Sequence, residues 1–215
     1  MSTSYRFGVS LFVLSAAFAV SPANAAVVIG NWENNTDGWI DWSGGQQPIA
    51  APKFTYATTG VTLGSTSLQL THAGWNQNLA IKLQDNGHIP AFMSNTHFSI
   101  DVSVPPSGAP SGWSQIWELA INSPAGWQPQ QPVPAHTFGF PNGNVQTVTL
   151  TYDYSALLAS LPPTPGWVEF IFATNNDNTH TTFYFDNARL HLIPEPASLG
   201  LLGLAATGLL FRRRR

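Results

Sequence analysis

The sequence contains no cysteine, so the fold can use neither disulfides nor zinc sites built on thiolates. Positive charge is also scarce in the central part of the chain. Between residues 26 and 193 the lysines and arginines are Lys53, Lys82 and Arg189. Ten acidic residues oppose these three, so with neutral histidines this segment has a net charge of −7. Such an acidic segment lacks the basic surface that binds nucleic acid or anionic lipid.

Recognisable catalytic motifs are absent as well. The six histidines are scattered and lack the H-E-x-x-H spacing of zinc proteases. Neither a G-x-S-x-G nucleophile elbow nor a phosphate-binding loop occurs in the sequence. The sequence therefore contains no motif that identifies an enzyme.

Residues 1–25 have the three parts of a secretory signal peptide. Arg6 precedes the apolar run FGVSLFVLSAAFAV, and the small-residue segment SPANA follows that run. The last three residues of this segment fit the A-x-A pattern that signal peptidase cleaves. We therefore expect cleavage between Ala25 and Ala26 and export of the chain.

Residues 194–215 end in a hydrophobic segment followed by four arginines. The fifteen residues from Ala197 to Phe211 would form a helix of about 22 Å, shorter than a hydrocarbon core of about 30 Å. The arginines would hold the C-terminal end in the cytoplasm while the rest of the chain crosses the membrane. We expect a short membrane helix that is recognised and processed. An ordinary single-pass anchor is the alternative.

The tail begins with Pro194-Glu195-Pro196, before the hydrophobic segment and the arginines. This order of features resembles a PEP-CTERM sorting signal. The resemblance implies that an exosortase, a membrane enzyme similar to a transpeptidase, is the processing partner. It also implies a Gram-negative-type envelope, removal of the tail near the motif, and release or attachment at the cell surface. Proteins with this signal are commonly associated with exopolysaccharide and biofilm matrix. The residues that carry the resemblance are Pro194, Glu195, Pro196, Arg212, Arg213, Arg214 and Arg215.

Residues 26–193 are long enough for one domain with a hydrophobic core, and their pattern predicts an all-β sandwich. Short runs of alternating apolar and polar residues are separated by clusters of Gly, Pro, Asn and Ser. The segment 155–161 is typical of a short helical connector. Strands are expected at 67–71, 79–83, 97–104, 114–122, 146–154, 167–174 and 183–192.

Alternation along these strands separates a core face from an outer face. On the strand 114–122 it places Trp117 in the core and both Glu118 and Asn122 on the outer face. On the strand 167–174 it places Phe170 in the core and Glu169 on the outer face. We therefore expect two packed sheets that leave an outer face open for a ligand.

Near its two ends this domain contains an acidic, turn-rich segment around Glu33 and an aromatic strand around Asp186, with the segment 63–71 between them. This order resembles a galactose-binding-like jelly roll, the fold of many carbohydrate-binding modules. The resemblance implies a structural Ca²⁺ held by Glu33 and Asp186, with backbone carbonyls near Ser67 as further ligands. Oxygen atoms are the ligands that Ca²⁺ prefers. The alternative is that Glu33 faces solvent and Asp186 caps a turn. The segments that carry the resemblance are NWENNTDGW (31–39), LGSTSLQLT (63–71) and FYFDNARL (183–190).

Eight tryptophans are more than the core of such a domain needs. A flat indole can cover the C–H face of a sugar while nearby amides and carboxylates bond its hydroxyls. The alternative is that these indoles only pack over the edge of the sandwich. Candidate sugar-binding tryptophans in polar loops are Trp75, Trp113 and Trp127, with Gln115, Glu118 and Asn122 as hydrogen-bond partners, whereas Trp32, Trp39 and Trp117 are expected in the core.

The sequence thus favours an exported protein at the cell surface or in its matrix, with a non-catalytic carbohydrate-binding-like domain. One alternative is a structural matrix protein that binds no specific sugar. A second alternative is a glycoside hydrolase that uses Glu118 and Glu169, because glycosidases work with a pair of carboxyl groups.

Overall fold

The computed structural model describes residues 25–71, 77–105, 116–135, 138, 143–175 and 182–193. Nearly all regular structure in these residues is β-strand, and the two helices are short. In chain order the elements are β1 (Val27–Gly30), β2 (Trp39–Asp41), β3 (Gln47–Pro48), β4 (Phe54–Ala57), β5 (Ser67–Thr71), β6 (Gln77–Lys82), α1 (Ile89–Ser94), β7 (His97–Val104), β8 (Ile116–Ser123), β9 (Gly126–Gln130), β10 (Gln146–Asp153), α2 (Ser155–Leu158), β11 (Glu169–Asn175) and β12 (Thr182–His191).

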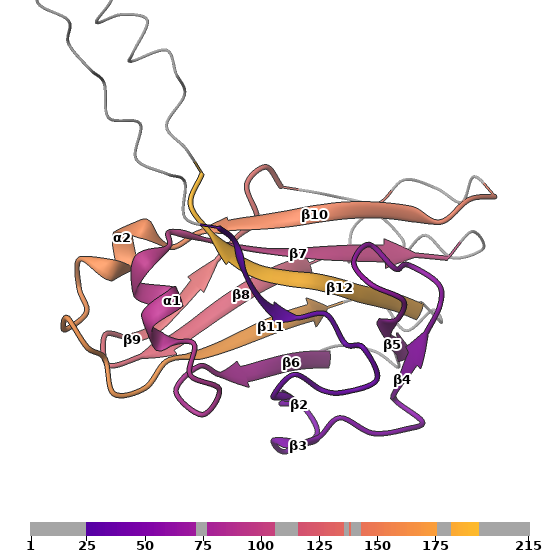
Figure 1. Cartoon of the computed structure of the whole chain (residues 1–215), viewed down its shortest axis with the longest axis horizontal. Helices are drawn as coiled ribbons and strands as arrows, with labels where there is room; N and C mark the ends of the chain where they lie inside the picture. Colours follow the sequence, from indigo (N-terminus) through magenta and orange to yellow (C-terminus); the bar gives the residue numbers. More distant parts are fainter. Residues whose placement is uncertain are drawn as a thin grey trace, which may run out of the picture.

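The strands form two antiparallel sheets that pack face to face (Figure 1). Sheet A has the strand order β10-β7-β12-β5-β4, with β1 paired to the second half of β12. Sheet B has the order β3-β2-β6-β11-β8-β9. This arrangement confirms the predicted all-β sandwich.

Each of the seven expected strands is present, and the segment 155–161 begins with helix α2. The elements that the sequence pattern does not predict are β1, β2, β3, β4, β9 and α1. None of these is longer than six residues, so each contains too few alternations to be recognised. Strand β9 also contains Pro129, which an edge strand tolerates. The loop expected around Trp127 is therefore wrong, because Trp127 lies on β9.

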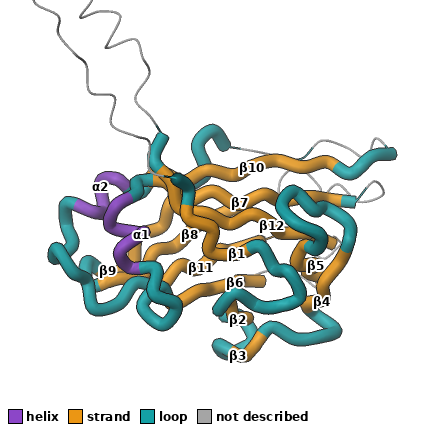
Figure 2. Tube along the Cα trace, in the orientation of Figure 1, coloured by secondary structure: helices purple, strands orange, loops and turns teal. Residues whose placement is uncertain are grey.

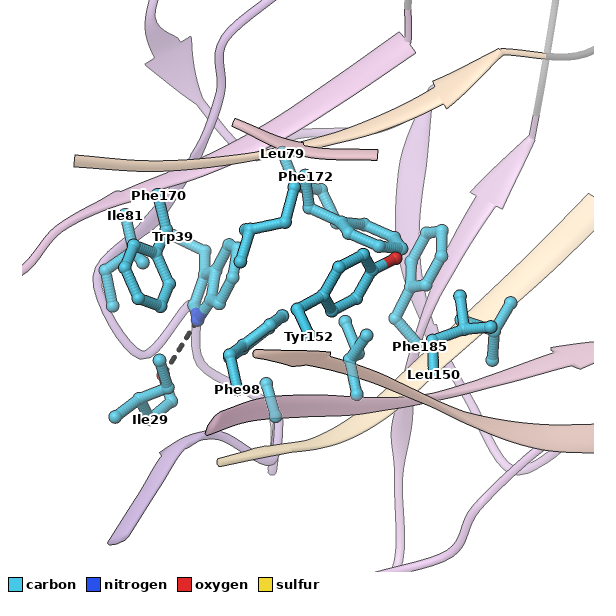
Figure 3. Packing of buried hydrophobic residues seen from close by; sticks show 14 of the residues in the cluster. Ile29, Trp39, Leu79, Ile81, Phe98, Leu150, Tyr152, Phe170, Phe172 and Phe185 are labelled. Carbon is cyan, nitrogen blue, oxygen red and sulfur yellow. Dashed lines mark hydrogen bonds between the residues drawn. The ribbon is translucent and has the colours of Figure 1, made fainter. Parts of the chain in front are cut away.

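Aromatic side chains from both sheets fill the core (Figure 3). Phe98 of sheet A meets Phe170 of sheet B edge to face, with ring centroids 5.4 Å apart, and Tyr152 meets Phe172 in the same way at 6.2 Å. Edge-to-face contacts of this kind add stability beyond burial alone. As expected, Trp32, Trp39 and Trp117 are buried in this core.

Strand β1 closes the sandwich at the point where both ends of the described chain meet. Trp39 Nε1 donates a 2.7 Å hydrogen bond to the Ile29 carbonyl, drawn as a dashed line in Figure 3. Gly30 lies so close that a Cβ there would be 2.7 Å from Trp39 Nε1, so only glycine fits without a shift. Val27 pairs with Leu190, and Figure 1 shows the indigo start of β1 beside the yellow end of β12.

Helices α1 and α2 lie together at one end of the sandwich (Figure 2). Phe92 of α1 stacks on Tyr154, with ring centroids 4.8 Å apart, and the Tyr154 hydroxyl donates a hydrogen bond to the Phe92 carbonyl. All described helices and strands lie between Val27 and His191, within the domain boundaries of 26–193 expected from the sequence. Within the described residues no helix is long and apolar enough to cross a membrane. The expected signal peptide and C-terminal membrane helix lie outside these residues, apart from Ala25.

Candidate functional site

The outer face of sheet B, the face turned away from the core, carries the side chains that alternate with the buried aromatics. Its middle row crosses the sheet in register through Ile40 of β2, Ala80 of β6, Ile171 of β11 and Ala120 of β8. Ala80, Ile171 and Ala120 are almost fully buried although they face outward. A second apolar cluster therefore lies on this face, and larger side chains cover it.

Tryptophans provide part of that cover. Trp42, directly after β2, packs against the small side chains of the middle row. Its ring centroid lies 6.4 Å from that of Trp127 on β9. Three strands separate β2 from β9, a span of about 19 Å at the usual strand spacing. Both indoles must therefore lean inward, so that the two rings lie over the middle of the sheet.

The alternation of β11 assigns a third tryptophan to the same face. Trp167 lies two residues before Glu169, the first residue of β11, and extending the alternation back to it places it on the outer side. It is 40% exposed and Trp127 is 49% exposed, whereas Trp39 in the core is 1% exposed. The outer face of sheet B thus presents partly exposed indole surface beside the buried row of Ala80, Ile171 and Ala120.

A polar row lies beside the middle row. Lys82 of β6, Glu169 of β11, Asn122 of β8 and Trp127 of β9 are in register across four neighbouring strands. Glu169 is 8% exposed, and its Oε1 has no hydrogen-bond partner. Among the ion pairs between described residues, none joins Glu169 to Lys82.

Trp42 Nε1 is a second buried polar atom without a partner on this face. A buried donor or acceptor that makes no hydrogen bond costs about 1–3 kcal/mol. Each such atom in a native protein calls for an explanation, and Trp32 Nε1 and Trp117 Nε1 in the core are further examples. On the outer face of sheet B, the unpartnered Glu169 carboxyl and Trp42 indole lie beside the partly exposed Trp127, and this combination makes the face a candidate binding surface.

The register of β8 and β11 also tests the glycosidase hypothesis. Glu118 and Glu169 both lie on the outer face, as predicted, but Glu118 pairs with Ala173, four residues from Glu169. This offset corresponds to about 13 Å along the strands, whereas paired glycosidase carboxyl groups lie about 5–9.5 Å apart. In addition, Glu118 Oε2 accepts a 3.0 Å hydrogen bond from Gln131, on the β9 side of Glu118. The geometry therefore disfavours joint catalysis by these two groups.

The structure brings together three of the six predicted ligand-binding residues: Trp127, Glu118 and Asn122 lie on the outer face of sheet B. Trp75, Trp113 and Gln115 lie outside the described residues. Sequence reasoning did not assign ligand contacts to Trp42 or Trp167. The alternation of 167–174 did carry a signal for Trp167, because it places Trp167 on the same side as Glu169.

The residues predicted to hold calcium lie around the loop 59–66, on the opposite sheet. Asp186 of β12 is fully buried. Its Oδ2 accepts hydrogen bonds from the backbone N–H groups of Thr62 (2.6 Å) and Leu63 (2.8 Å), and its Oδ1 accepts one from the N–H of Asn187 (2.7 Å). Burial raises the pKa of the Asp186 carboxyl, and these hydrogen bonds oppose that rise.

Glu33 binds the other end of the same loop. Its Oε1 accepts hydrogen bonds from the N–H groups of Ser65 (2.6 Å) and Thr66 (3.0 Å), and its Oε2 accepts one from the Ser65 hydroxyl. The Ser65 hydroxyl, followed by the two N–H groups, lowers the pKa of Glu33. The Ser67 hydroxyl donates to the Thr59 carbonyl. N–H and O–H donors thus satisfy both acids without a cation, and calcium stays a prediction.

Comparison with solved structures shows that the sandwich has the fold of carbohydrate-binding modules. A module described as CBM28, specific for non-crystalline cellulose, matches at 16% identity with a TM-score of 0.53, over 79% of this chain and 96% of that chain. The CBM22-1 xylan-binding domain of Paenibacillus barcinonensis Xyn10C matches at 14% identity and a TM-score of 0.46, over 80% and 95%. A further CBM22 xylan-binding domain matches at 17% identity and a TM-score of 0.45, over 82% and 99%.

The C-terminal segment has a family match of its own. Residues 192–215 match the PEP-CTERM protein-sorting motif, which confirms the resemblance seen in the sequence. The motif implies export, sorting to the cell envelope or surface, and processing by an exosortase. The chain is therefore a PEP-CTERM-sorted protein with a sandwich like that of carbohydrate-binding modules. No curated protein matches the sequence significantly.

Proposed function

We propose that this protein binds a polysaccharide on the outer face of sheet B without cleaving it, at the surface of a Gram-negative-type bacterium or in its extracellular matrix. One observation carries the proposal. Trp42 and Trp127 lie together on a face that also carries a buried carboxyl group and an indole N–H without hydrogen-bond partners, and alternation adds Trp167 to this face.

The chemistry of this face suits a sugar chain. The C–H faces of sugar rings can stack on Trp42, Trp127 and Trp167, which provide flat and rigid apolar surface. Sugar hydroxyls can donate to Glu169 and can exchange hydrogen bonds with Asn122. Ala80 and Ala120 are themselves covered by larger side chains, so a sugar ring would rest on the indoles above them.

The two terminal segments supply the route to the surface. Signal peptidase would remove residues 1–25, and the hydrophobic tail would hold the chain in the membrane until the exosortase acts near Pro194. The processed protein is then released or attached at the surface, in contact with exopolysaccharide or biofilm matrix. Because β12 ends at His191, the sandwich lies within a few residues of the processing motif.

Affinity electrophoresis of residues 26–193 against a panel of soluble polysaccharides tests binding. We expect at least one polysaccharide to retard the wild type, and W127A and W167A to weaken this retardation at least tenfold. The matched control is Y56A, which removes an exposed aromatic ring from edge strand β4 of sheet A. Retardation by no polysaccharide, or equal losses in Y56A and W127A, would overturn the proposal.

A structural matrix protein without sugar specificity is the second candidate. The packing of Trp42 and Trp127 over the second apolar cluster favours it, because a spacer domain also needs that cluster covered. In that case W127A lowers the melting temperature and changes no interaction with polysaccharide. The same variant thus separates the two candidates.

A further inference from the structure

We infer that the polysaccharide recognised by the outer face of sheet B carries protonated amino groups, as a glucosamine polymer does. This inference rests on the proposed function and names the ligand class. It is drawn from the charge and hydrogen bonding around Glu169, and from the indoles beside it.

Glu169 is the first residue of β11, a central strand with two strands of sheet B on one side and three on the other. More than nine-tenths of its surface is buried, and no protein donor reaches Oε1. A buried carboxyl group needs donors, and if ionised it also needs a positive partner. A ligand ammonium group would supply both at once, whereas a hydroxyl would supply only a donor.

The lysines and arginine in the described part of the chain do not fill this role. Lys53 is engaged elsewhere, because its Nζ lies 2.7 Å from Asp41 Oδ1. Arg189 lies on β12 of sheet A, where its side chain approaches Asp101. Lys82 is in register with Glu169 on the neighbouring strand, yet no ion pair forms between them. Glu118, on the same face, adds a second acidic side chain that would attract a cationic chain rather than a uronic acid.

The indoles favour the same ligand. An ammonium group near the face of a tryptophan ring is attracted by the negative charge of the π-system. Trp127 is in register with Glu169, one strand beyond Asn122, and Trp167 precedes Glu169 by two residues in the sequence. Aromatic rings that surround a cationic group recognise ligands such as choline and methylated lysine. Neutral glucans would use the rings but would leave the carboxyl group without a counter-charge.

Calorimetric titration of residues 26–193 with three β-1,4-linked hexasaccharides provides the test. The hexamers of glucose, N-acetylglucosamine and glucosamine share one backbone and differ only at carbon 2, which bears a hydroxyl, an acetamide or an amine. At mildly acidic pH, where the amines are protonated, we expect the glucosamine hexamer to bind at least tenfold more tightly than the other two. Added salt should weaken the binding of this hexamer alone.

Two variants distinguish a specific effect of Glu169 on this preference from a general effect of the protein's negative charge. E169Q should reduce the tenfold preference to less than about threefold, because the amide offers no counter-charge. D85N removes one exposed carboxylate from a turn and should keep the preference. Circular dichroism melting of both variants verifies folding, and the wild-type series alone decides the inference if E169Q does not fold.

Each outcome has a defined meaning. A preference for the glucose or N-acetylglucosamine hexamer would overturn the amino-sugar inference and leave carbohydrate binding intact. An equal loss of preference in E169Q and D85N would also overturn it, because attraction to net charge would then explain the result. Binding of no hexamer, together with no retardation by any polysaccharide, would overturn the inference and the proposed function together.

Discussion

The outer faces of the two sheets are built from similar antiparallel strands but satisfy their buried carboxyl groups differently. On sheet A, Asp101 Oδ1 accepts a 2.6 Å hydrogen bond from the Thr149 hydroxyl, and its Oδ2 accepts one of 2.7 Å from the Thr62 hydroxyl. On sheet B, Glu169 is buried to a similar extent, yet its Oε1 accepts no hydrogen bond. The first face satisfies its buried carboxyl group within the fold, whereas the second leaves a buried carboxyl oxygen without a partner.

A loop explains the difference on sheet A. The loop 59–66 lies over β7 and β12, close enough that a Cβ on Gly60 would be 2.6 Å from the Tyr184 Cβ and 3.0 Å from the Ser103 Cβ. Gly60 has a φ of 71°, a left-handed conformation that glycine adopts without strain. The outer face of sheet A is thus closed by its own chain at this place. Stability and ligand binding are therefore expected to depend on different sheets.

The largest expected effect compares one chemical change on each sheet. D186N replaces a carboxylate that accepts hydrogen bonds from three backbone N–H groups, so it should lower the free energy of unfolding by about 3 kcal/mol. E169Q makes the same change where no such bond exists, so it should lower the free energy of unfolding by clearly less than D186N does. Chemical denaturation of residues 26–193 measures both. Equal losses would mean that Glu169 is as structural as Asp186.

Calcium is the next test of sheet A. If Glu33 and Asp186 hold Ca²⁺ as proposed from the sequence, a free concentration ten times the Kd stabilises the fold by about 1.4 kcal/mol. The melting temperature should then rise with Ca²⁺ and fall again with EGTA, and D186N should abolish the response. An unchanged melting temperature in the wild type would mean that the N–H donors of the loop 59–66 are sufficient partners for both acids.

The sequence predicted the long strands well because each contains several alternations. It also placed Glu118, Asn122 and Glu169 on outer faces before their positions in space were known. The short strands β2 and β9 were missed, and with them the contact between Trp42 and Trp127. That contact depends on the strand order β2-β6-β11-β8-β9, and alternation within a single strand carries no information about sheet order.

A smaller effect concerns the tryptophan pair on sheet B. Aromatic pairs at this separation contribute about 0.5–1.5 kcal/mol beyond burial. A double-mutant cycle of W42A and W127A should therefore give a coupling free energy of about 1 kcal/mol in the absence of ligand. Thermal denaturation of the four proteins measures this value. Additive losses would show that the two indoles cover the face independently.

The smallest expected effect is a pH dependence of the stability. Glu33 and Asp186, the two acids at the loop 59–66, contribute to it with opposite signs. Hydrogen bonds lower the pKa of Glu33 below its ordinary 4.5, so its contribution to stability is complete above that value and is lost as the pH falls through the lowered pKa. Burial raises the pKa of Asp186 above its ordinary 3.8, so its contribution is present below that value and is lost as the pH rises through the raised pKa.

Melting temperatures measured between about pH 6 and pH 3 separate these two contributions. The difference between wild type and E33Q should shrink on acidification, whereas the difference between wild type and D186N should grow. D85N, which changes an exposed acid in a turn, gives the background for both curves. A difference that grows for E33Q would contradict the lowered pKa and would mean that the Ser65 and Thr66 donors do not hold Glu33 in solution.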